Sequence, residues 1–139
     1  MSAEWGLIPR TKAFAIRIVR LYTRLPRTLE AQVIGKQVLR SGTSVGAHVR
    51  EGKRSRTDAE MLSKASVALQ ELDETAYWLE LIAELGFVKP GKLTGLMEEA
   101  EELIAILVAS TKTLKARNQK PRSSSFRTHH SSLITSPRS

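Results

Sequence analysis

Two acidic side chains and one histidine in this sequence could perform acid–base chemistry. Glu71 and Glu74 share one side of a predicted helix, and His48 lies on the helix before it. A hydrolase would use such carboxylates as an acid–base pair and the histidine as a proton shuttle. In the alternative interpretation these groups form a structural layer, in which polar side chains satisfy one another and fix the register of two helices.

We favour the structural layer, because the predicted folded region carries no second histidine, no metal-ligand set and no group of oxyanion donors. Arg40 is expected to form a buried pair with Glu71 or Glu74 in this layer. The expected polar layer comprises Arg40, Ser44, His48, Glu51, Glu71 and Glu74. The sequence therefore predicts no enzyme, no metal site and no cofactor.

A stripe of arginines predicts a second kind of chemistry, the binding of phosphate. Basic residues at positions 10, 17, 20, 24 and 27 repeat at helical spacing along the first predicted helix, with no acid between them. Arginine matches phosphate with two parallel hydrogen bonds, whereas a solvated face is the alternative interpretation. The basic surface that we expect to bind RNA or DNA comprises Arg10, Arg17, Arg20, Arg24, Arg27, Lys36, Lys53, Arg54 and Arg56.

Charge is divided unevenly along the chain. Residues 10–56 contain 12 Lys/Arg and 2 acids, whereas residues 57–104 contain 3 Lys/Arg and 11 acids, within a net charge of +8. The basic part suits a polyanion such as RNA or DNA. Alternatively, basic and acidic faces of neighbouring copies meet, which would make the protein an oligomeric protein–protein interaction scaffold without nucleic-acid binding.

The absence of cysteine excludes disulfides, thiolate zinc sites and cysteine nucleophiles. The first residues lack the apolar run of a signal peptide. No apolar run approaches the roughly 20 residues that span a bilayer. We therefore expect a cytoplasmic protein with no membrane partner.

Four segments of helical periodicity position these residues, and no segment reads as a strand. We expect helices at 11–25, from Thr28 through the small residues that follow, at 57–85 and at 94–117. Short connections favour antiparallel neighbours. The sequence predicts an all-α, antiparallel up-and-down four-helix bundle over residues 1–117. A disordered, serine-rich basic tail is expected over residues 118–139.

Local signals set the expected helix ends and the first core positions. Thr28, Thr57 and Thr94 are predicted N-caps, and Glu60 completes a capping box with Thr57. Gly86 is the predicted C-cap of the third helix. The apolar face of the first helix comprises Phe14, Ile18, Leu21 and Leu25.

The segment VLRSGTSVGAHVREG (residues 38–52) combines three glycines with serine and threonine. A phosphate-binding loop would follow a strand and carry Gly-Lys-Ser/Thr, and neither feature occurs here. A loop is the main alternative, since Ser-Gly often marks a turn. We expect a helix, because the spacing of Ile34, Val38 and Val45 continues through the segment. Its small side chains would let the helix of Glu71 and Glu74 pack closely.

The segment QVLRSGTSVGAHVREG (37–52), followed by ALQELDETAYWLELIAELG (68–86), resembles the four-helix-bundle family of the 23S ribosomal RNA intervening-sequence proteins. A related bundle is the accessory protein of diversity-generating retroelements, which works beside a reverse transcriptase. The resemblance implies assembly into a pentameric ring, association with nucleic acid and a reverse transcriptase as a partner. His48 stands where the family usually has asparagine.

A second apolar line on the third predicted helix fits such assembly. Tyr77, Trp78 and Leu81 lie beside its core face, and aromatic residues are enriched at subunit contacts. We expect these three residues to contact another subunit. The sequence thus predicts a non-enzymatic, homo-oligomeric, nucleic-acid-associated accessory protein.

Overall fold

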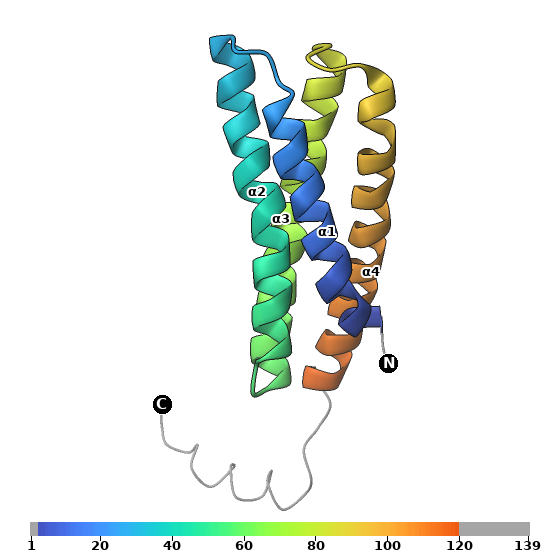
Figure 1. Cartoon of the computed structure of the whole chain (residues 1–139). Coiled ribbons are helices and arrows are strands. Elements are labelled where there is room, and N and C mark those ends of the chain that lie inside the picture. The colour runs from blue at the N-terminus through green and yellow to red at the C-terminus, as the bar shows by residue number, and fades with distance from the viewer. Residues whose placement is uncertain (1–2, 120–139) are drawn as a thin grey trace, which may run out of the picture.

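The computed structural model describes residues 3–119, and four long helices make up most of this range. Successive helices run up, down, up and down, and each packs against two neighbours (Figure 1). The helices are α1 (Ala3–Thr23), α2 (Leu29–Lys53), α3 (Asp58–Glu84) and α4 (Thr94–Gln119), with a short 3₁₀ helix, η1 (Pro90–Lys92), before α4. The predicted all-α four-helix bundle is confirmed.

The first helix begins earlier than its sequence pattern indicates. The predicted start at Thr11 is wrong, because α1 begins at Ala3 and continues through Pro9. Proline removes one intrahelical hydrogen bond, but Leu7 and Thr11 on either side of it are buried in the bundle. The Thr11 hydroxyl donates to the Leu7 carbonyl (2.6 Å), as a threonine inside a helix does.

The N-termini of α2 and α3 have the predicted caps. The Thr28 hydroxyl accepts a hydrogen bond from the Ala31 N–H (3.4 Å), and the Thr57 hydroxyl accepts one from the Glu60 N–H (3.0 Å). The Glu60 carboxylate accepts in return from the backbone N–H of Arg56 (3.0 Å), one residue before the usual capping-box partner. These bonds satisfy N–H groups that the first turns leave without an intrahelical acceptor.

The end of α3 is also as predicted. Gly86 has a φ of +70°, which suits glycine because it has no Cβ. Its N–H donates to the Ala83 carbonyl (3.1 Å), and the Phe87 N–H donates to the Ile82 carbonyl (3.2 Å). These two bonds make a Schellman motif, which ends α3 and directs the chain towards α4.

Both ends of α4 differ from the prediction. Thr94 is no N-cap: it is the first residue of α4, directly after η1, and its hydroxyl donates to the Pro90 carbonyl (3.1 Å). At the other end the helix reaches Gln119, so residues 118 and 119 are helical and not part of a tail. The rest of the predicted tail lies outside the described residues. None of the helices within residues 3–119 is long and apolar enough to cross a membrane.

The glycine-rich stretch is helical, as predicted, and lies within α2. A Cβ atom at Gly42 would lie 2.8 Å from Cγ1 of Ile18, which is closer than carbon atoms pack. Glycine therefore lets α1 approach α2 closely, and this packing offsets a helix-propensity cost of about 1 kcal/mol. The expected packing against α3 holds for only part of the segment: Gly52 lies against Lys64 of α3, whereas Gly42 and Gly46 face α1.

Apolar side chains from all four helices form one core along the bundle axis. The predicted face of α1 is confirmed, since Phe14 and Ile18 are completely buried and Leu21 and Leu25 nearly so. The charged residues of α1 therefore lie on its other faces, where they contact solvent or α4.

Candidate nucleic-acid interface

Arg10, the first residue of the predicted arginine stripe, is paired within the bundle. Its Nη2 atom lies 2.7 Å from Oε1 of Glu99 and 3.0 Å from Oε1 of Glu102, both on α4. The hydrogen bond to Glu99, followed by the one to Glu102, raises the pKa of the Arg10 guanidinium above its usual value. Two acidic partners neutralise this charge, so Arg10 does not belong to an unpaired basic surface.

Two arginines of α1, together with Arg24 directly after its last residue, line a groove with a lysine from η1. The groove has a volume of about 210 Å³ and lies between α1 and the start of α4, near the upper end of the bundle in Figure 1. Its lining, which we name the arginine groove, comprises Arg17, Arg20, Leu21, Arg24, Lys92 and Leu96. Basic side chains from two separate elements therefore converge on one depression.

The arginine groove contains positive charge without a counter-charge. No acidic side chain lines it. Within residues 3–119, none of its four basic side chains takes part in a hydrogen bond or ion pair. Arg10, Arg40 and Arg117, by contrast, each pair with an acid. Unneutralised charges of one sign in a concave site attract an ion of the opposite sign.

The other predicted basic residues do not share this groove. Arg27 is exposed between α1 and α2, and Lys36 is exposed on α2. Lys53, Arg54 and Arg56 are exposed around the turn between α2 and α3, at the opposite end of the bundle. The nine expected residues are thus spread over several surfaces rather than one.

Lys92 belongs to the groove, although sequence reasoning missed it. It lies in a short turn with no helical periodicity, so spacing along the chain gives no reason to group it with the arginines. Only the packing of α4 beside α1 places it near Arg20 and Arg24. The sequence indicated the position of Lys92 only through the predicted packing of the first and fourth helices against each other.

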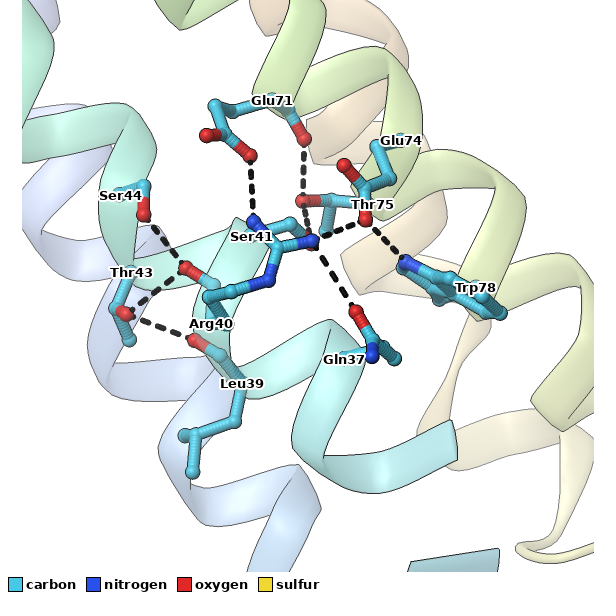
Figure 2. Close-up of polar contacts among 10 residues, drawn as sticks. All are labelled: Gln37, Leu39, Arg40, Ser41, Thr43, Ser44, Glu71, Glu74, Thr75 and Trp78. Carbon is cyan, nitrogen blue, oxygen red and sulfur yellow. Dashed lines mark hydrogen bonds and ion pairs between the residues drawn. The ribbon is translucent and has the colours of Figure 1, made fainter. Parts of the chain in front are cut away.

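Arg40 joins α2 to α3 through two acids, as Figure 2 shows. Its Nη1 lies 3.1 Å from Oε1 of Glu71, and its Nη2 contacts both Glu74 and Oε1 of Gln37, the latter at 3.2 Å. Glu74 also accepts a hydrogen bond from Nε1 of Trp78 (2.9 Å). Both expected partners of Arg40 are therefore present, but its side chain is 49% exposed, so the pair is not buried.

The other members of the expected polar layer lie elsewhere. Nδ1 of His48 lies 3.6 Å from Oε1 of Glu51, which contacts Nζ of Lys64 at 2.9 Å. The Lys64 hydrogen bond is the main cause that lowers the pKa of Glu51. Ser44 donates to the carbonyl of Arg40 in its own helix (2.7 Å). The expected layer is thus divided into separate clusters.

These positions leave His48 away from the two acids that an acid–base mechanism would need. No hydrogen bond or ion pair joins it to Glu71 or Glu74, all of which lie in the described part of the chain. Nor do three or more His, Asp or Glu side chains of residues 3–119 gather as a metal site would require. Glu71 and Glu74 instead contact Arg40 and thereby join α3 to α2.

A buried polar contact between α2 and α3 was not predicted. The hydroxyls of Ser41 and Thr75 are hydrogen-bonded, with 2.7 Å between their oxygens, and both residues are completely buried (Figure 2). The available signal was the spacing of Ser41 between the core residues Val38 and Val45. This contact between α2 and α3 lies inside the core, whereas the Arg40 pair does not.

The residues expected at a subunit contact lie near the end of α3. Tyr77 is 53% exposed, whereas Trp78 and Leu81 are half-buried. The rings of Tyr77 and Trp78 meet edge to face with centroids 5.1 Å apart. Leu29, at the start of α2, is 79% exposed at the same end of the bundle. Apolar surface therefore remains open in this region of the single chain.

Comparison with known proteins identifies the family. The family model described as "23S rRNA-intervening sequence protein" matches residues 7–109. A crystal structure of a protein of unknown function from the S23 ribosomal protein family of Bacteroides thetaiotaomicron VPI-5482 is 32% identical and superposes with a TM-score of 0.74. The match covers 80% of this chain and 99% of that one. No curated protein sequence matches significantly. The chain therefore belongs to the family of 23S rRNA-intervening sequence proteins.

Proposed function

We propose that this protein is a non-enzymatic, homo-oligomeric accessory protein of the cytoplasm that binds RNA or DNA through the arginine groove. One observation is the main support for this proposal. The groove gathers Arg17, Arg20, Arg24 and Lys92 around one space with no acidic partner. If these side chains formed only a solvated face, nothing would favour placing them together, because like charges repel one another.

The phosphate backbone of a nucleic acid is the polyanion that fits this groove. Guanidinium groups bind phosphate oxygens in pairs, and each phosphate contact releases counterions from the nucleic acid. The groove has no aromatic side chain on which a base could stack. Binding should therefore depend on phosphate contacts and show no sequence preference.

Assembly into a closed ring would strengthen binding. The exposed side chains of Tyr77 and Leu85 at the end of α3, and of Leu29 and Val33 at the start of α2, offer apolar surface to another copy. Family resemblance makes a pentamer the expected size. Several grooves on one particle would bind a long nucleic acid with avidity. The same resemblance makes a reverse transcriptase the protein partner to test.

A second candidate function is an oligomeric scaffold without nucleic-acid binding. The observation that favours it is the division of charge, with most acids after residue 57 and most bases before it. Basic and acidic faces of neighbouring copies would then meet. In that case the cations of the arginine groove would find acids of another subunit, and added nucleic acid would not bind.

Charge reversal distinguishes these functions. The triple variant Arg17→Glu, Arg20→Glu, Arg24→Glu should lose binding to labelled single-stranded and duplex DNA in fluorescence anisotropy. The matched control reverses Arg50, Lys112 and Lys115, three exposed bases that change the net charge equally. The control should still bind, and both variants should keep the helical circular dichroism spectrum. Equal binding by the groove variant and the wild type would favour the scaffold.

A further inference from the structure

The arginine groove is a notch rather than a flat charged surface. Its basic side chains come from two sides, with Arg17 and Arg20 on α1, Arg24 directly after α1 and Lys92 on η1. Leu21 and Leu96 complete the lining. A volume of about 210 Å³ holds several groups of the size of a water molecule, each about 30 Å³. It therefore admits one phosphate group with its surrounding oxygens, but not a duplex.

Gly95, in the first turn of α4, lies beside the guanidinium of Arg17. A Cβ atom at Gly95 would lie 3.2 Å from Nη2 of Arg17, so the guanidinium occupies the space next to the glycine. A Cβ alone would require the end of the Arg17 side chain to shift by a few tenths of an ångström, and a longer side chain would compete with the guanidinium for this space.

The balance of charge indicates which phosphate fits best. Four cations surround the notch without an acid. A backbone phosphodiester brings one negative charge, whereas a phosphate monoester brings about 1.5 to 2 and three strong acceptor oxygens. Compared with a phosphodiester, the monoester can accept more hydrogen bonds from the guanidinium and ammonium groups. Its larger negative charge also reduces the repulsion among these cations more.

We propose that the arginine groove is a binding pocket for a phosphate monoester, supplied by the terminal phosphate of a nucleic-acid strand. This inference rests on the proposed nucleic-acid binding and adds a preference for strand ends to it. Internal backbone phosphates would occupy the same groove, but less tightly than a terminal phosphate. Lys92 and Gly95 distinguish the pocket from a general basic surface, because the lysine lines it from η1 and the glycine lies beside Arg17.

The direct test compares short single strands of one sequence that carry a 5′-phosphate, a 3′-phosphate or only hydroxyl ends. Fluorescence anisotropy at pH 7.5 should show about tenfold tighter binding of a phosphorylated strand, the difference made by one strong charge-assisted hydrogen bond. The preference should decrease below about pH 6, where the monoester takes up its second proton. Inorganic phosphate and AMP should remove the preference for phosphorylated strands if a free phosphate binds in the pocket. They should leave the preference unchanged if the pocket requires a phosphate attached to a strand.

Three variants connect the preference to the notch. Lys92→Ala should abolish it, whereas Lys89→Ala, an exposed lysine of the same loop that does not line the groove, should leave it unchanged. Gly95→Leu changes no charge and places a good helix former in α4, yet it should also abolish the preference. Thermal melts of all three should match the wild type within a few degrees.

The outcomes separate this inference from the proposed function. Equal binding of phosphorylated and hydroxyl-ended strands by the wild type would overturn the monoester pocket and leave general nucleic-acid binding intact. A preference that survives both Lys92→Ala and Gly95→Leu would place the phosphate elsewhere and also overturn it. Failure of every strand to bind at low salt would contradict the proposed function itself.

Discussion

The Arg40→Ala substitution removes two of the ion pairs that link α2 to α3. A buried pair would cost about 3–5 kcal/mol when one partner is removed, which is the value that the sequence-based expectation implied. The observed side chains are 49% exposed for Arg40, 21% for Glu71 and 35% for Glu74. Exposed ion pairs contribute about 0.2–1 kcal/mol each. We therefore expect the free energy of unfolding to fall by about 1–2 kcal/mol.

Double-mutant cycles with Glu71→Ala and Glu74→Ala should resolve the two pairs. Removing Glu74 should cost more than removing Glu71, because Glu74 also accepts the hydrogen bond from Nε1 of Trp78. Urea unfolding at 25 °C and one fixed protein concentration measures these differences. The coupling energies should decrease between 0.05 and 1 M NaCl, since salt screens partly exposed charges.

Two results would refute this reasoning. A loss above about 3 kcal/mol for Arg40→Ala, with no dependence on salt, would mean that the pair is buried in solution, for example under another subunit. No measurable coupling to either acid would mean that the contacts in Figure 2 do not stabilise the bundle.

Two further predictions concern packing and assembly. Gly42→Ala should destabilise the bundle by about 1–3 kcal/mol, because its Cβ would overlap the side chain of Ile18; unchanged or raised stability in urea unfolding would argue against close packing of α1 on α2. Light scattering at micromolar concentration should give a particle mass that is a multiple of 15.4 kDa, and Tyr77→Ser with Leu85→Ser should lower it. A monomeric wild type at physiological salt would contradict the proposed ring.

Much of the fold could be predicted because its signals are local. Thr28, Thr57 and Gly86 act within one turn of the helices that they delimit, so their roles are readable from neighbouring residues. The start of α1 was misplaced because a tertiary effect, the burial of Leu7 and Thr11, holds the helix through Pro9. The sequence pattern around Pro9 does not indicate that burial.

The candidate site was harder to predict because it depends on distances between elements. Helical spacing correctly places residues 40, 44 and 48 on one side of α2, but a rise of 1.5 Å per residue separates 40 from 48 by about 12 Å along the axis. His48 therefore meets Glu51 and not Glu71. Likewise, nothing in the spacing of the stripe reveals that Arg10 meets Glu99 on α4.

The salt dependence of binding tests the central claim, that the arginine groove binds nucleic-acid phosphates, most directly. For duplex DNA, log K should fall linearly with log[NaCl] at a slope of about −0.9 per phosphate neutralised. The double variant Arg20→Ala, Lys92→Ala removes part of the groove charge. It should make this slope shallower by the contribution of one to two phosphates for each bound subunit. The pair Arg50→Ala and Lys112→Ala, with the same change in charge, should leave the slope unchanged. Equal slopes for the wild type and the groove variant would contradict the claim.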